Sequence, residues 1–315
     1  MNIIKGKLNR AQRVILYGPE GVGKSTLAAA FPHPLVLDTE DGSHHLDVDR
    51  VPVARLADIV QAIAEVQQMQ AAGTCAYESL VIDTADALWR MCAEQVCLDN
   101  NWKNIEQPGY GKGYAIASAR FTGLFRSLDQ LMRAGMHVVI VCHMKVVKVN
   151  LPDAPEFSRY CLKVSAPTSQ AETAREFLKE WCDALIFCTI RNEVDGLKGK
   201  AVRANERVAF CTSNPHCESK NRLGLPPEVP LTPEALSALW GGAPAAASAA
   251  PASAEGHAAE LPSSPVPAAA DGGCRAQMAN PEGVRLRRRS MLSCWGISAG
   301  WVSWLSDRGS MIFRQ

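Results

Sequence analysis

Residues 18–25 read Gly-Pro-Glu-Gly-Val-Gly-Lys-Ser and match the pattern G-x-x-x-x-G-K-[ST]. Residues 13–17 before them are apolar and β-branched and predict a buried strand, and residues 26–31 after them predict a helix that ends at Pro32. In that context the turn forms a phosphate cradle, because backbone N–H groups and the positive end of the helix dipole face the anion. The alternative, a chance glycine turn, does not explain both flanks.

The predicted ligands of this cradle are ATP and Mg²⁺. Lys24 is expected to reach the β and γ phosphates, and the Ser25 hydroxyl is expected to bind Mg²⁺. Further contacts to the nucleotide are expected from the rest of the turn and from the residue that follows it. The predicted nucleotide-binding residues are therefore Gly18, Pro19, Glu20, Gly21, Val22, Gly23, Lys24, Ser25 and Thr26.

Apolar runs alternate with amphipathic stretches between residues 13 and 240. The predicted strands are 13–17, 35–38, 79–83, 136–142 and 184–189, and the predicted helices are 56–71, 85–98 and 114–134. This alternation predicts an α/β fold with a mostly parallel central sheet, flanked by helices through right-handed crossovers. Residues 184–212 instead predict a late antiparallel extension, with turn residues at Asp195, Gly196 and Gly199.

Ligands of such sheets lie at the carboxyl ends of the strands, so the polar residues there are candidates. Asp83 ends the run Leu-Val-Ile-Asp and is expected to hold Mg²⁺ together with Ser25. Glu40 follows strand 35–38, where it is either the base that deprotonates the attacking water or a solvated turn acid. His143 follows strand 136–142, and it either senses the γ-phosphate or bonds to local backbone.

Net charge and cysteine usage exclude several classes of protein. The net charge of +1 gives no bulk field toward DNA or a membrane, and no run of about 18 apolar residues is present to span one. The basic N-terminus lacks the apolar run of a signal peptide, so a cytoplasmic protein without membrane contact is expected. The eleven cysteines form no C-x-x-C pair, and Cys211, His216 and Cys217 lack a fourth ligand, which disfavours a structural metal site.

Composition changes sharply near residue 241. Residues 1–240 are predicted to form the nucleotide-binding core, and residues 241–275 a linker rich in Ala, Pro and Ser that has little to bury. Residues 276–315 combine a basic run at 285–289 with Trp295, Trp301 and Trp304 but show no helical or strand period. This tail is predicted to be disordered.

The order Lys24, Glu40, Asp83 and His143 resembles the RecA-like ATPase core over residues 13–149. In that family the P-loop is followed by a strand that supplies the catalytic glutamate, by a strand ending in the Mg²⁺-binding aspartate, and by a strand ending in a γ-phosphate sensor. The resemblance implies the same three roles for Glu40, Asp83 and His143.

Residues 109–114, 180–184 and 219–226 are similar to segments of phage AAA-type nucleotide-binding proteins, which include the single-strand annealing ATPases of the Sak group. This resemblance implies a homo-oligomer that acts on single-stranded DNA, in a bacterial host or prophage context. Lys220 and Arg222 resemble the Lys-x-Arg pair with which ring-forming RecA-like helicases reach the nucleotide of a neighbouring subunit. The alternative for this pair is a solvated basic turn.

Two segments have the composition of a surface that binds single strands. Residues 100–114 mix aromatic, basic and glycine residues, which stack on bases and neutralise phosphates without reading sequence. Residues 144–148 follow His143 as a predicted loop. The candidate contacts are Trp102, Lys103, Tyr110, Lys112, Lys145 and Lys148. The equal alternative is that the aromatic residues pack on the core while the lysines are solvated.

The sequence thus predicts a Mg²⁺-dependent ATPase, stimulated by single-stranded DNA, in phage-type recombination or annealing. Two alternatives stay open at this point. The first is a P-loop kinase of a small molecule, for which the sequence offers no clear Arg-bearing lid. The second is a non-catalytic annealing module in which ATP is structural.

Overall fold

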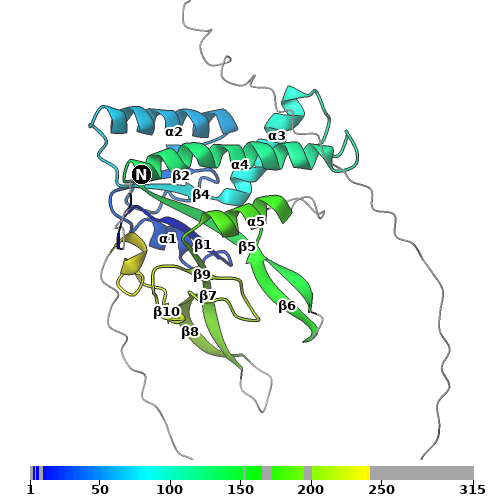
Figure 1. Cartoon of the computed structure of the whole chain (residues 1–315). Coiled ribbons are helices and arrows are strands. Elements are labelled where there is room, and N and C mark those ends of the chain that lie inside the picture. Colours follow the sequence, from blue (N-terminus) through cyan, green and yellow to red (C-terminus); the bar gives the residue numbers. More distant parts are fainter. Residues whose placement is uncertain are drawn as a thin grey trace, which may run out of the picture. The chain divides into compact units, whose positions relative to one another are not determined.

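The strand that precedes the glycine-rich turn, β1 (Arg13–Gly18), lies in the middle of a sheet with the order β10-β8-β7-β1-β5-β4-β2-β3 (Figure 1). The computed structural model describes Ile3, Lys5, Gly6 and residues 10–151, 154–164, 172–194 and 201–241, with the backbone alone at residues 151, 154, 172–173, 192–194 and 201–205. All of these residues belong to one compact unit, which comprises Met1–Ala252.

The centre of the sheet is parallel, as the alternation of strands and helices predicts. β1 pairs in parallel with both its neighbours, and the parallel strands are β1, β2 (Pro34–Asp38), β3 (Asp49–Pro52), β4 (Ser79–Asp83), β5 (His137–Leu151) and β7 (Ala184–Val194). The antiparallel additions are β6 (Ala154–Leu162), β8 (Ala201–Phe210), β9 (Lys220–Asn221) and β10 (Glu228–Pro230). The predicted fold class, including the late antiparallel extension, is confirmed.

Both faces of this sheet are buried, which explains why its strands are apolar throughout. In β1, Val14 and Leu16 point to one face while Ile15 and Tyr17 point to the other, and all four are fully buried. The first face is covered by α1 (Lys24–Ala28) and the short helix η2 (Ser237–Trp240). The second face is covered by α2 (Leu56–Ala71), α3 (Ala85–Asp99), α4 (Lys112–Arg133) and α5 (Glu172–Trp181) (Figure 1).

Several predicted elements differ from the structure in length or number. The helix after the P-loop spans Lys24–Ala28 and so ends earlier than the predicted residue 31. β5 continues to Leu151 and pairs with β6, so residues 144–148 are half of a β-hairpin and the prediction of a loop there is wrong. The reason is tertiary: strand β6, which the sequence analysis did not predict, supplies the hydrogen-bond partners for this extension. Strand β3 and helix α5 were not predicted either.

Some predictions concern residues outside the described ones. They are the turn residues Asp195, Gly196 and Gly199, the linker after residue 241 and the tail that carries the three tryptophans. In the described part of the chain, no helix is long and apolar enough to cross a membrane. Cys142, Cys182, Cys188 and Cys211 are buried core residues.

Candidate nucleotide-binding site

The glycine-rich turn leaves β1 at Gly18 and enters α1 at Lys24. A Cβ atom at Gly18 would lie 1.9 Å from the carbonyl oxygen of Cys188 in β7, so only glycine fits between these two strands. Gly23 has a φ of 107° and caps α1, a conformation that other residues rarely adopt. These two positions explain why the motif requires glycine at its ends.

Lys24 is the buried cation of the turn, with only 6% of its surface exposed. Its Nζ donates hydrogen bonds to the carbonyl oxygens of Gly18 at 3.1 Å and Pro19 at 2.7 Å, while no described carboxylate forms an ion pair with it. Burial lowers the pKa of this amine. An ammonium held only by neutral carbonyls is suited to receive an anion, so the turn fits a phosphate.

Ser25 and Asp83 bring the two predicted metal-binding residues together. The Ser25 Oγ donates to Asp83 Oδ2 at 2.5 Å, which joins the start of α1 to the end of β4. Burial raises the pKa of Asp83, and the hydrogen bond from Ser25 opposes that rise. A hydroxyl and a carboxylate are hard oxygen ligands of the kind Mg²⁺ takes beside a nucleotide, so this pair fits the ion.

The acidic cluster after β2 separates into residues with different surroundings. Asp38 is buried and accepts hydrogen bonds from the backbone N–H groups of Glu40 at 3.2 Å, Gly42 at 3.2 Å and Ser43 at 2.8 Å. Burial alone would raise the pKa of Asp38, but the bonds from Ser43 lower it. Asp38 therefore holds the turn, whereas the side chain of Glu40 stays exposed at its tip.

Thr39 joins this turn to the end of β4. Its backbone N–H donates to the Asp83 carbonyl oxygen at 2.8 Å, its Oγ1 donates to the same oxygen at 2.7 Å, and it accepts from the Thr84 N–H at 2.7 Å. These hydrogen bonds hold the ends of β2 and β4 together, and they thereby fix the position of Glu40 relative to Asp83.

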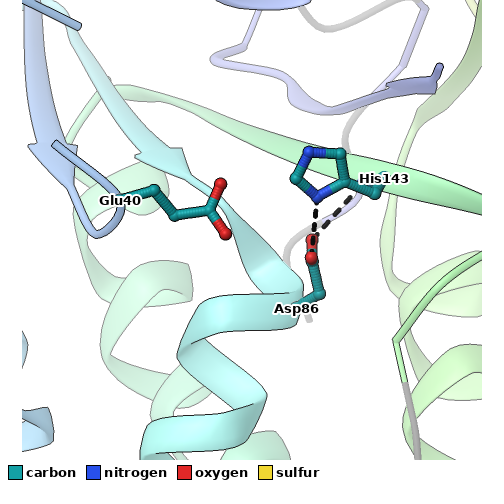
Figure 2. A group of neighbouring side chains, drawn as sticks. All are labelled: Glu40, Asp86 and His143. Atoms are coloured by element: carbon teal, nitrogen blue, oxygen red, sulfur yellow. Dashed lines mark hydrogen bonds and ion pairs between the residues drawn. The ribbon is translucent and has the colours of Figure 1, made fainter. Parts of the chain in front are cut away.

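His143 lies where β5 passes the same edge. Its Nδ1 is 2.7 Å from Oδ2 of Asp86, in the first turn of α3, and its Nε2 is 4.0 Å from the Glu20 carboxylate in the P-loop. Figure 2 shows the carboxylate of Glu40 facing this pair, and ligand atoms of Glu40, Asp86 and His143 lie within 4.8 Å of one another. These three side chains are also the described group that could hold a second cation.

The hydrogen bond to Asp86 raises the pKa of His143. Burial alone would raise the pKa of Asp86, but the hydrogen bonds from His143 lower it. Both shifts favour the charged forms of the two side chains. The sequence analysis did not identify Asp86. The available signal was its position: Thr84, which follows the strand that ends in Asp83, caps α3, and Asp86 lies in the first turn of that helix.

Lys220 and Arg222 lie at the opposite, amino-terminal edge of the sheet, beside the start of β7. The Lys220 Nζ donates to the carbonyl oxygens of Lys179 at 2.7 Å and Glu180 at 2.9 Å, and Arg222 Nη1 is 3.5 Å from the buried carboxylate of Asp183. Neither side chain reaches the P-loop of its own chain.

Of the aromatic residues between 100 and 114, two pack on the protein. Tyr114 is buried and donates to Glu106 at 3.0 Å, and Trp102 packs against the cluster of α3 and α4. Tyr110, in contrast, is fully exposed, with Lys103 and Lys112 exposed nearby in the chain. In the hairpin, Lys148 pairs with Glu156 at 2.8 Å.

Comparison with known proteins agrees with this geometry. A search of curated proteins gave no match. A family model described as an AAA domain matches residues 10–223, roughly two thirds of the 315 residues. That range contains the P-loop, the ends of β2 and β4, and His143 in β5, all of which form the site. The chain therefore belongs to the AAA domain family, with a P-loop nucleotide-binding fold.

Proposed function

We propose that this protein is a Mg²⁺-dependent ATPase that acts on single-stranded DNA in recombination or strand annealing. The observation that carries the enzymatic part is the meeting of three strand ends and the middle of β5 at one edge of the sheet. The P-loop follows β1, Glu40 follows β2, Asp83 ends β4, and His143 lies in β5. Ligands of open α/β sheets bind at this edge.

In this proposal the backbone N–H groups of residues 20–25 bind the phosphates and Lys24 neutralises their charge. Ser25 and Asp83 would hold Mg²⁺, which supplies neutralisation of the charge that develops on the phosphates. The Ser25–Asp83 hydrogen bond already places both oxygen ligands side by side. Glu20 and His143 close the γ-phosphate side of the turn.

Glu40 is proposed to be the general base. Its carboxylate is exposed and faces the site, whereas the nearby Asp38 is occupied by its own turn. Water attacks the γ-phosphorus, the bond to the bridging oxygen of ADP breaks, and Glu40 takes the proton. The His143–Asp86 pair beside Glu40 is proposed to bind the γ-phosphate through the imidazole when ATP is present and to lose that contact after hydrolysis.

Two features support action on single-stranded DNA. β5 runs from His143 without a break into the β5–β6 hairpin. A movement of His143 when the γ-phosphate binds or leaves would therefore be transmitted along this strand to the hairpin. Tyr110 presents an exposed aromatic ring between Lys103 and Lys112, which suits stacking on a base beside a phosphate. Trp102 and Tyr114 are not part of this proposed surface because they pack on the helices.

A homo-oligomer is part of the proposal. Arg222 lies at the edge opposite to its own P-loop, and 55% of its side chain is exposed, so it is able to act only on the nucleotide of a neighbouring subunit. An arginine supplied in this way stabilises the charge of the transferring phosphoryl group.

The decisive experiment measures phosphate release by wild-type protein and by Lys24→Ala, with no DNA, with single-stranded DNA and with duplex DNA. We expect wild-type turnover to rise with single strands and the Lys24→Ala variant to be inactive throughout. The control variant is Arg133→Ala, which removes one positive charge at the carboxyl end of α4 and should behave as wild type. Undiminished activity of Lys24→Ala would overturn the proposal, and turnover that needs a small-molecule acceptor would indicate a kinase.

A further inference from the structure

Arg207 is a second cation beside the P-loop, contributed by the antiparallel part of the sheet. It lies in β8, two strands away from β1, and its side chain is exposed. A Cβ atom built on Gly23 would lie 3.4 Å from Arg207 Nη1 and 4.0 Å from Leu231 Cδ2. The guanidinium therefore reaches over β7 to the last glycine of the phosphate-binding turn.

The backbone of Arg207 is held in place, and the charge of its side chain is available to a ligand. Its carbonyl oxygen accepts from the Leu231 N–H at 3.0 Å, which ties β8 to the segment after β10. Glu206, the neighbouring acid, pairs instead with Arg191 at 3.2 Å. Among the residues that the structure describes, no carboxylate pairs with Arg207. A guanidinium that lies beside a phosphate-binding turn without a described carboxylate partner is suited to bind a phosphate oxygen.

The two sides of the turn differ in chemistry. Asp83 ends β4, His143 lies in β5 and Glu40 follows β2, all on the β5–β4–β2 side of β1. In the proposed function Mg²⁺ and the γ-phosphate therefore belong on that side. Arg207 approaches Gly23 from the opposite side, through β7 and β8. A nucleotide whose γ-phosphate faces the acids must direct its α-phosphate and nucleoside toward β7 and β8.

We propose that Arg207 binds the α-phosphate of the nucleotide from within the same chain. This inference rests on the proposed function, because it requires that the turn binds a nucleotide. The contact between Arg207 and the α-phosphate would be the same before and after hydrolysis, because ADP keeps that phosphate. The γ-phosphate contact proposed for His143, in contrast, would be lost on hydrolysis. Arg207 is thus expected to retain ADP as well as ATP.

The test measures the dissociation constants of ATP and ADP, each with Mg²⁺, by isothermal titration calorimetry of the full chain. Arg207→Ala should weaken the binding of both nucleotides by about the same factor, roughly tenfold, since it removes a hydrogen bond between charged groups that solvent weakens at an exposed site. Arg207→Lys should recover part of the loss. Arg133→Ala, which removes an exposed arginine at the opposite edge of the sheet, should bind both nucleotides as wild type does.

Two results would overturn this inference. The first is wild-type affinity of Arg207→Ala for both nucleotides while the variant remains folded by circular dichroism. The second is a loss of affinity for ATP alone, which would place the contact of Arg207 on the γ-phosphate. Failure of the proposed function gives a different result, because then the wild-type protein binds neither nucleotide or Lys24→Ala binds them unchanged.

Discussion

The Nδ1 atom of His143 lies 2.7 Å from Oδ2 of Asp86, and the backbone N–H of His143 donates to Oδ1 of the same carboxylate at 3.3 Å. Two contacts to one carboxylate fix the imidazole between α3 and β5, with Nε2 directed toward Glu20 in the P-loop. The residue that follows the buried part of β5 is therefore held in place by a helix that begins after β4.

This pair predicts a pH-dependent contribution to stability. The pKa of His143 is raised, so its contribution is complete below the unfolded value of about 6.5 and disappears as the pH rises through the folded pKa. The pKa of Asp86 is lowered, so its contribution persists down to about pH 4. His143→Asn should therefore reduce the free energy of unfolding by about 1.5–3 kcal/mol at pH 5.5 and by less at pH 8.5, measured by urea denaturation. An equal loss at both pH values would contradict the charged pair.

Glu40→Gln is expected to bind ATP normally but to hydrolyse it about 10²–10⁴ times more slowly, because the amide keeps the shape of the side chain and loses its basicity. Asp41→Asn is the matched control, since Asp41 is the next residue and is also exposed. Single-turnover hydrolysis and nucleotide titration separate the two effects. Normal turnover by Glu40→Gln would remove it as the base.

Asp183→Asn should destabilise the fold without a direct effect on the phosphate site. The buried Asp183 carboxylate accepts from Arg10 at 2.8 Å and from the Arg13 backbone and side chain, each at 3.2 Å. Removing one partner of a buried pair costs about 3–5 kcal/mol, and the partial exposure of the arginines places this case at the lower end. Asp99→Asn, which disrupts a partly exposed pair with Arg120, should cost less than about 1 kcal/mol in the same urea titration. A similar decrease in the free energy of unfolding for both variants would contradict the conclusion that the buried Asp183 carboxylate stabilises the fold through its arginine partners.

Arg222→Ala should be well folded but inactive, and it should regain activity when mixed with Lys24→Ala subunits. A mixed assembly contains some sites with one intact P-loop and one intact arginine, and arginine fingers contribute about 10³–10⁵ in rate. Activity is measured on mixtures for which light scattering shows co-assembly. Absence of recovery under those conditions, or near-normal activity of Arg222→Ala alone, would contradict a role of Arg222 at the neighbouring subunit's nucleotide. Its contact with Asp183 would then be its remaining role.

The double variant Tyr110→Ala, Lys112→Ala should weaken binding to single-stranded DNA and reduce its salt dependence. Stacking contributes about 1–3 kcal/mol per base, and each lost phosphate contact lowers the slope of log affinity against log salt by about 0.7. Tyr110→Phe keeps the ring and should bind as wild type. Leu98→Ala removes another exposed apolar side chain and serves as a control for surface effects. An unchanged salt slope in the folded double variant would contradict this surface.

The sequence alone determined the nucleotide-binding turn and the order of the main strands and helices. Helix α2 and strand β4 have the predicted bounds, because local periodicity and flanking residues are sufficient to define them. Glu40, Asp83 and His143 were identified for a similar reason: each follows an apolar run, and parallel topology brings the carboxyl ends of such runs to one edge.

Tertiary structure decided the contacts that join residues distant in the chain. The extension of β5 depends on hydrogen bonds from β6, and the pairing of His143 depends on Asp86 in another element. Arg207 reaches Gly23 only because β8 folds back antiparallel to β7. Local sequence patterns record which residues are buried or polar, but which strand lies beside which, and hence which charges meet, is fixed by packing across the whole sheet.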